Sequence, residues 1–325
     1  MSQRDVPGLM GFKGLSALRA RAVVRGSRIE ERRIVVPPDD LRELTTIEDR
    51  NAVFREHAPR LAAEACVQVV RGRPDDASAL VTSSCTGYMV PSLAVELVGR
   101  LGLCGDVARL PITEAGCSGG VVAIARAADY LAAHPGASAV AAAVELCSLS
   151  FHQSEDEGVL TANLIFGDGA GAALLESGDG PGIEVVDSSS YLVPGSRHML
   201  GFDLTNEGFY PVLSRELVQA LPVPTMQAAA SLLARHGLRS SDVSAWLLHP
   251  GGSRILSRLE SEMGLERSQT RWSWESLREF GNTSSAAIFD VLRRYLDDAR
   301  AAEWGVVAAF GPGVAVELLL VRREC

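Results

Sequence analysis

The chain has 325 residues, of which hydrophobic residues make up 47% and charged residues 22%. This composition is typical of a folded protein with a substantial core and excludes wholesale disorder. The 31 basic and 40 acidic residues give a formal net charge of -9, so we expect neither nucleic acid nor an anionic membrane as a partner. At about 150 residues per domain, this length predicts two units or one large duplicated fold.

The six cysteines are scattered along the chain, without a C-x-x-C pair or a Cys/His cluster at metal-ligand spacing. We therefore expect reduced thiols, no bound metal and a cytoplasmic location. No apolar run is expected to reach the roughly 18 residues that span a bilayer, because glycine and proline interrupt the richest one, residues 306–321. The N-terminus also lacks the apolar core of a secretory signal, so the sequence predicts a soluble protein.

Strand-like apolar runs alternate with helical patterns, which predicts an α/β fold with helices packed against a largely parallel sheet. In chain order, the first half shows a strand at residues 79–82, helices at 92–101 and 118–133, and a strand at 137–145. The second half shows a helix at 224–236, a strand at 243–248, helices at 254–263 and 284–301, and a hairpin at 306–321.

One internal repeat is visible, because residues 166–175 resemble residues 310–319, each a glycine-rich turn leading into an apolar strand. The two segments lie 144 residues apart, counted from Phe166 to Phe310. Residues 176–182 have the composition of a linker. We therefore predict an N-terminal half, residues 1–178, and a C-terminal half, residues 179–325. The alternative is that the two segments are merely similar hairpins.

Cys117 is a candidate nucleophile, because it directly precedes an amphipathic stretch and would lie at the N-terminus of a helix. The helix dipole and free N–H groups there favour a thiolate, so we expect the thiol pKa to fall from about 8.5 toward neutrality. Neighbouring glycines leave room for a substrate. The alternative is a buried structural cysteine.

His249 and Asn282 are candidate partners of the nucleophile. His249 ends the predicted strand and is followed by Pro250 and two glycines, and active groups gather beyond the carboxyl ends of strands in α/β folds. Asn282 could cap the following helix or donate a hydrogen bond to an oxygen that gains negative charge. Each residue could also be only a turn or cap residue.

Two further segments could bind phosphate groups. Residues 167–171 lack the Gly-Lys-Ser/Thr ending of a nucleotide loop and precede a strand, so we interpret them as a structural turn. A basic cluster of Arg28, Arg32 and Arg33 could pair with the phosphates of CoA, or could be a solvated charged surface.

Seven segments in order resemble the chalcone and stilbene synthase-like type III polyketide synthases, with a match that runs from about Arg28 to the end of the chain. The Glu145-Leu146-Cys147-Ser148-Leu149 segment is most similar to bacterial members. The matching segments are residues 82–87, 115–120, 144–149, 166–171, 246–252, 281–286 and 310–313.

The resemblance implies a thiolase-type fold, with two duplicated αβ halves in a five-layered αβαβα arrangement, and a homodimer. It implies that Cys117 carries the acyl group, that His249 is the acid/base partner and that Asn282 is the oxyanion donor. The substrates would be an acyl-CoA starter and malonyl-CoA, joined by repeated decarboxylative Claisen condensation and cyclised to an aromatic or pyrone product. No cofactor beyond the CoA thioesters is implied.

The resemblance also assigns residues to the substrate cavity. Phe166 matches an aromatic gatekeeper, and Val90 matches a residue that reaches into the partner subunit's cavity. Cys85 stands where plant relatives have a threonine that helps to direct aldol cyclisation. No second gatekeeper is evident around residues 208–211, and Phe202, near them in the sequence, is expected to narrow the cavity. The remaining positions that shape cyclisation and cavity volume are Glu145, Cys147, Ser150 and Ser284.

Other interpretations stay open at this point. The segment before Arg28 is shorter than in the family, so either the start lies upstream or one edge of the sheet is trimmed. An initiating ketoacyl-ACP synthase shares the Cys/His/Asn arrangement, although residues 249–252 and 310–313 favour the polyketide synthases. A catalytically silent thiolase-fold partner subunit is disfavoured because all three candidate residues are present.

Overall fold

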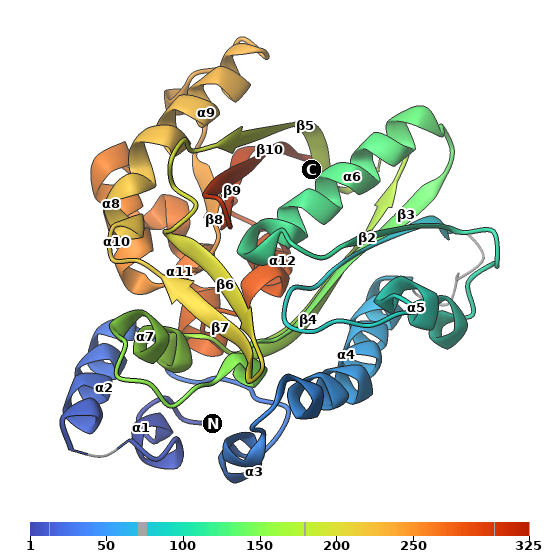
Figure 1. Ribbon diagram of the computed structural model, residues 1–325. Coiled ribbons are helices and arrows are strands. Elements are labelled where there is room, and N and C mark those ends of the chain that lie inside the picture. The colour runs from blue at the N-terminus through green and yellow to red at the C-terminus, as the bar shows by residue number, and fades with distance from the viewer. Residues whose placement is uncertain (13, 71–76, 179, 302, 325) are drawn as a thin grey trace.

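The computed structural model describes residues 1–12, 14–70, 77–178, 180–301 and 303–324, and Figure 1 shows their arrangement. Asp179, the first residue of the expected second half, and Cys325 lie outside the described residues. Within them, the strands form two four-stranded sheets and one two-stranded hairpin.

The first sheet has the order β2-β1-β3-β4, with β1 parallel to β2 and β3 and with β4 antiparallel to β3. Its strands are β1 (Ala77–Ser83), β2 (Ala108–Ile112), β3 (Ser138–Leu146) and β4 (Asp168–Glu176). The second sheet has the order β5-β10-β9-β8, with β10 antiparallel to both neighbours and β8 parallel to β9. Its strands are β5 (Gly182–Leu192), β8 (Ala245–Leu248), β9 (Trp304–Gly311) and β10 (Ala315–Glu324).

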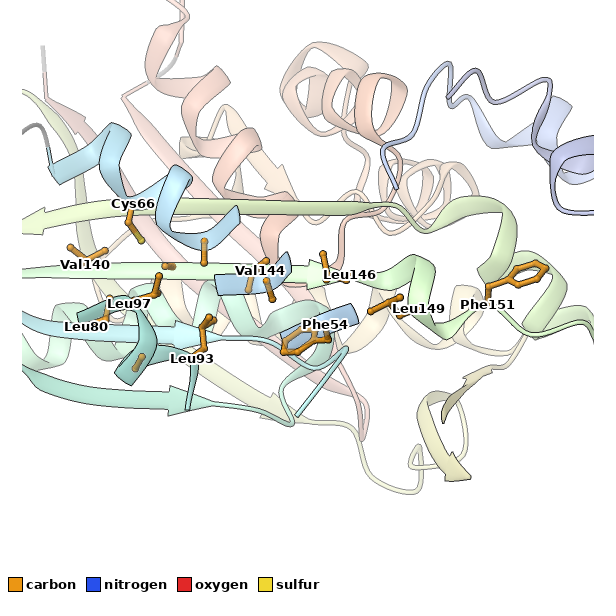
Figure 2. Packing of buried hydrophobic residues seen from close by; sticks show 14 of the residues in the cluster. Phe54, Cys66, Leu80, Leu93, Leu97, Val140, Val144, Leu146, Leu149 and Phe151 are labelled. Atoms are coloured by element: carbon orange, nitrogen blue, oxygen red, sulfur yellow. The ribbon is translucent and has the colours of Figure 1, made fainter. Parts of the chain in front are cut away.

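Helices cover both faces of each sheet. Alternate residues of a strand point to opposite faces, so each strand contributes side chains to both helix layers. Val140 and Val144 of β3 pack toward α4 (Ile47–Val70) and α5 (Leu93–Leu101), as Figure 2 shows. Ala141 and Ala143 point the other way, toward α6 (Gly119–Ala133) and α12 (Ala287–Asp297).

The two inner helices α6 and α12 lie between the sheets, where they share one core with β9 and β10 (Figure 1). On the outer side of the second sheet, α9 (Pro222–Ala234) and α10 (Ser253–Met263) pack against the face of β8, β9 and β10 that points away from α6 and α12. This confirms the predicted α/β fold with five alternating layers.

The remaining elements carry much of the chain that the sequence patterns did not assign. They are α1 (Val6–Leu9), α2 (Gly14–Ser27), α3 (Pro38–Glu43), α7 (Glu157–Ile165), β6 (Leu200–Thr205), β7 (Gly208–Leu213), α8 (Leu217–Ala220), α11 (Arg267–Phe280), η2 (Gly116–Ser118), η3 (Cys147–Ser150), η4 (Ser240–Asp242) and η5 (Ser284–Ala286). The predicted helix at residues 284–301 consists of η5 followed by α12 and ends at Asp297.

The expectation of a structural turn at residues 167–171 is wrong in part, because β4 already begins at Asp168. The glycines of this segment instead leave room for neighbouring elements to pack closely against the strand. A Cβ atom on Gly169 would lie 3.2 Å from Thr283 Cγ2, and one on Gly171 would lie 2.6 Å from Phe289 Cβ. Glycine therefore lets β4 approach α12 and the loop before it.

One apolar segment is longer than the sequence analysis expected. Residues Leu217–Ala234, which span α8 and α9, have the length and composition of a helix that could cross a membrane. Half of that segment is buried, and it contains Pro222 and Pro224. Leu232 and Leu233 pack into the core beside the second sheet, as expected for a core helix.

We predict that Gly120→Ala destabilises the protein, because a Cβ atom there would lie 2.2 Å from the carbonyl oxygen of Ser285. The expected loss is roughly 1–3 kcal/mol in the free energy of unfolding, measured by urea denaturation. Gly99→Ala in α5 is the matched control, because no heavy atom lies within 4 Å of its added Cβ. The control should gain about 0.5–1 kcal/mol, and equal stability of the two variants would contradict the close packing.

Candidate active site

Cys117 lies in the short helical turn η2, directly before α6. Gly116 precedes it with φ of 53°, a left-handed conformation that favours glycine. A Cβ atom on Gly116 would lie 2.5 Å from Pro312 Cδ, so the turn of the nucleophile packs against the loop between β9 and β10. The predicted position at the start of a helix is therefore observed, and the second half of the chain holds it there.

His249 follows the last residue of β8, and its backbone N–H donates to the carbonyl of Ala308 at 2.7 Å. The side chain is only 2% exposed. Within the described part of the chain, neither ring nitrogen has a hydrogen-bond partner. The imidazole therefore keeps both ring nitrogens available for a further hydrogen bond, as do the buried ring nitrogens of Trp246 and Trp272.

Asn282 is fixed at both its backbone and its side chain. Its N–H donates to the carbonyl of Ile165 at 2.9 Å, and its side-chain Nδ2 donates to the carbonyl of Gly251 at 3.3 Å. Its Oδ1 accepts from the N–H of Ser284 at 2.9 Å. The preceding Gly281 has φ of 70° and no room for a Cβ atom, which would lie 2.8 Å from the Ile165 carbonyl oxygen.

Asn282 links the other two candidates. Its side chain and that of Ser284 lie near enough to the Cys117 sulfur to lower the pKa of the thiol. Its amide also contacts Gly251, where an added Cβ atom would lie 3.2 Å from Cδ2 and 3.5 Å from Nε2 of His249. The fold therefore gathers Cys117, Asn282 and the turn that carries His249 around one point.

Burial dominates the electrostatics of this site. It raises the pKa of the Cys117 thiol to about 12, although the neighbouring polar side chains of Ser284 and Asn282 act in the opposite direction. It lowers the pKa of His249 to about 4. The predicted lowering of the thiol pKa is therefore wrong for the substrate-free protein. Removing the thiolate from water by burial raises the pKa more than the helix dipole lowers it. Both groups are neutral at pH 7.

A cavity of about 20 Å³ adjoins the nucleophile. The expected residues Cys85, Cys147, Phe166, Phe202 and Ser284 line it together with Cys117. The sequence analysis missed that the β6–β7 hairpin closes the cavity, since only Phe202 of its residues was singled out. The other lining residues from this hairpin and from two loops are Leu200, Gly201, Pro211, Val212, Leu213, Gly116 and Pro312.

Glu145 and Ser150 lie behind the cavity wall rather than on its surface. The Glu145 carboxylate accepts from the N–H of Cys85 at 3.1 Å and from the hydroxyl of Thr86 at 2.8 Å, and Ser284 donates to it at 3.5 Å. Burial raises its pKa. The Ser150 hydroxyl donates to the carbonyl of Cys147 at 2.7 Å. Both residues thus hold others that line the cavity.

The predicted basic cluster is split. Arg32 is 1% exposed and donates to the carbonyls of Asn163, at 2.9 Å, and of Phe166, so a CoA phosphate cannot reach it. Arg28 and Arg33 are exposed, and Arg33 donates to the carbonyl of Glu279 at 2.9 Å. The expectation for Arg32 is wrong, because its guanidinium bonds the segment that carries the proposed gatekeeper.

The site resembles no metal centre. Across the described ranges of the chain, no group of three or more His, Cys, Asp or Glu side chains is placed to hold a metal ion. The arrangement is compatible with nucleophilic attack by sulfur, with an amide beside the sulfur and an imidazole on the turn that this amide contacts.

Comparisons with known proteins agree with this geometry. The N-terminal domain of chalcone and stilbene synthases matches residues 29–180, and their C-terminal domain matches residues 184–324. The chain is 36% identical over 313 residues to 1,3,6,8-tetrahydroxynaphthalene synthase of Streptomyces coelicolor, covering 93% of this chain and 82% of that protein. It is 32% identical to the alpha-pyrone synthesis polyketide synthase-like Pks18 of Mycobacterium tuberculosis, covering 94% and 83%.

The crystal structure of the Streptomyces coelicolor enzyme superimposes with a TM-score of 0.94 at 30% identity, covering 100% of this chain and 96% of the other. These matches define the class of protein as a type III polyketide synthase with a thiolase-type fold. The chain belongs to the chalcone and stilbene synthase family.

We predict that alkylation of Cys117 by iodoacetamide in the substrate-free protein accelerates about tenfold per pH unit between pH 7 and pH 9. A raised pKa leaves the sulfur as a thiol at neutral pH, and only the thiolate reacts. Peptide mass spectrometry separates Cys117 from the exposed Cys104, which serves as the internal reference. A rate at Cys117 that is already constant above pH 7 would show a low pKa and contradict the prediction.

Proposed function

We propose that this protein joins malonyl-CoA units to an acyl group carried on Cys117. The Cys117 sulfur attacks the thioester carbonyl of a starter acyl-CoA, the C–S bond to CoA breaks and free CoA leaves. Malonyl-CoA then loses CO₂, and the resulting enolate carbon attacks the Cys117 thioester, which releases the sulfur. The observation that carries this proposal is that the fixed Asn282 amide lies beside the buried Cys117 thiol and also donates to Gly251, in the turn that carries the unpaired imidazole of His249.

His249 and Asn282 have distinct tasks in this proposal. The ring of His249 accepts the proton of Cys117 as attack begins, so that the thiolate and the imidazolium form together and stabilise each other. Neither charge alone is favourable there, since burial opposes both. During decarboxylation, His249 and the Nδ2 of Asn282 donate hydrogen bonds to the enolate oxygen.

The product type, the chain length and the CoA contacts are also proposed, on the basis of the relatives and of the residues in the cavity wall. Relatives named for tetrahydroxynaphthalene and alpha-pyrone synthesis support an aromatic or pyrone product. Phe166 and Phe202 narrow the cavity, and Glu145 positions Cys85 and Ser284, so these residues would govern chain length and cyclisation. Exposed Arg28 and Arg33 stay candidates for CoA phosphates.

We further propose a cytoplasmic homodimer that works without a cofactor beyond its CoA substrates. Val90 is 75% exposed, which supports a contact with the partner subunit. Sedimentation equilibrium at micromolar concentration measures the assembly. The division of the chain between residues 178 and 179 stays a prediction.

We expect purified protein to form product from acyl-CoA and malonyl-CoA without carrier protein, and Cys117→Ala to abolish acyl loading. Intact-protein mass spectrometry after incubation with acyl-CoA measures the thioester directly. Cys104→Ala should load fully, because that exposed cysteine lies outside the cavity. Undiminished loading of Cys117→Ala, or strict dependence on acyl carrier protein, would overturn the proposal.

We expect Asn282→Ala to lose roughly 10²–10³-fold in CO₂ release from malonyl-CoA, the typical effect of removing one oxyanion donor. Loading of Cys117 should continue, which separates the enolate step from acylation. Asn206→Ala, at an exposed position, is the matched control and should keep full activity. Decarboxylation within about threefold of the unchanged protein would assign the oxyanion role to another group.

A further inference from the structure

The C-terminal end of α7 presents four carbonyl groups that are paired by groups outside the helix. The N–H of Phe166, the cap residue, donates to the carbonyl of Ala162, and the N–H groups of the next two residues donate to other segments. The last carbonyls of a helix lack a donor within the helix and need partners from elsewhere. Here they are the carbonyls of Asn163, Leu164, Ile165 and Phe166.

Two of these carbonyls are each bonded by one group from a distant segment. Nε2 of Gln3 donates to the Leu164 carbonyl at 2.6 Å. The backbone N–H of Asn282 donates to the Ile165 carbonyl at 2.9 Å. The Gln3 side chain is buried, and Leu164 does not line the cavity beside Cys117. Gln3 therefore stabilises the end of α7 without touching the cavity wall.

Arg32 bonds the other two carbonyls. Its Nη1 donates to the carbonyl of Asn163 at 2.9 Å and also to the carbonyl of Phe166. A cation is favourable at a helix C-terminus, because the carbonyl dipoles there carry partial negative charge. Burial lowers the pKa of Arg32 to about 10, although the nearby charge of Asp168 acts in the opposite direction. The guanidinium is therefore still charged at pH 7.

The backbone is fixed on both sides of Phe166. Two residues later, the Asp168 carboxylate accepts from the N–H and the hydroxyl of Ser148, at 2.7 Å and 2.6 Å. The stem of Arg32 packs against Gly281, where an added Cβ atom would lie 3.1 Å from its Cγ. Phe166 lines the cavity, whose volume of about 20 Å³ leaves room for about one water molecule. The wall must therefore yield before an acyl chain can enter.

We propose that Arg32 is a positioning residue, which holds Phe166 in the cavity wall and thereby limits the length of the acyl starters that reach Cys117. This inference rests on the proposed function, in which Cys117 accepts the acyl group. Without the guanidinium, the carbonyls of Asn163 and Phe166 lose their donor, so the end of α7 becomes more mobile. The Phe166 side chain then yields more easily, and longer acyl chains enter.

The readout is the rate of acyl loading on Cys117, followed by intact-protein mass spectrometry with hexanoyl-CoA and with palmitoyl-CoA. The ratio of the two second-order rate constants measures selectivity for chain length. We expect Arg32→Met to shift this ratio about tenfold toward palmitoyl-CoA, and Arg32→Lys, which keeps the charge, to shift it less. An unchanged ratio in Arg32→Met would overturn the proposal.

Gln3→Met is the matched control. It also removes a buried donor from the end of α7, but it leaves the Phe166 carbonyl bonded to Arg32. We therefore expect a similar loss of stability, with a selectivity ratio within about twofold of the unchanged protein. An equal shift of the ratio in Gln3→Met and Arg32→Met would show general loosening of α7 and contradict a specific role of Arg32.

A double variant shows whether Arg32 acts through Phe166. Phe166→Ala removes the side chain that Arg32 positions, so adding Arg32→Met to it should change the ratio no further, and the single effects should be non-additive. A full additional shift in the double variant would overturn the proposal. If Arg32→Met does not fold, Arg32→Lys takes its place in both comparisons. Absence of loading in the unchanged protein would refute the proposed function, whereas normal loading with an unchanged ratio would refute only the role of Arg32.

Discussion

Two backbone hydrogen bonds join the halves of this protein at the point where its chemistry is assembled. The N–H of Asn282 donates to the carbonyl of Ile165, and the N–H of Gly167 donates to the carbonyl of Asn282, both at 2.9 Å. This bridge places the amide of Asn282 beside Cys117, although the two residues lie far apart in the chain. Buried Arg32 donates to the carbonyl of Phe166 within the same bridge, so the cavity wall and the amide of Asn282 are held together.

Burial of Cys117 and His249 away from water is the second constraint, because it opposes the charged forms of both side chains in the substrate-free protein. Burial disfavours a thiolate at Cys117 and an imidazolium at His249 separately, so we expect the proposed proton transfer between them only if the two charges form together. A dry site also strengthens hydrogen bonds to a developing enolate. The low charge of the resting site is thus compatible with an enzyme that avoids hydrolysis of its thioester.

Local motifs were sufficient to predict the three candidate catalytic residues and most core strands, because glycine-rich turns and apolar runs determine them locally. They were insufficient for α4, since Pro59 inside that helix argues against a helix. They also placed Arg32 on the surface, because charged residues are rarely buried without a partner. The direction of the Cys117 pKa shift was wrong for a related reason: a helix start is visible in a sequence, whereas the depth of a residue is not.

The two similar halves of the chain differ in how the edges of their sheets are covered. In the second half, β5 covers β10, and the apolar side chains beneath it lose nearly all contact with water. In the first half, the matching edge of β4 stays open, and the same residue types keep part of their surface exposed. The open edge lies on the strand that starts two residues after Phe166, so one short segment links this edge of the sheet to the wall of the cavity beside Cys117.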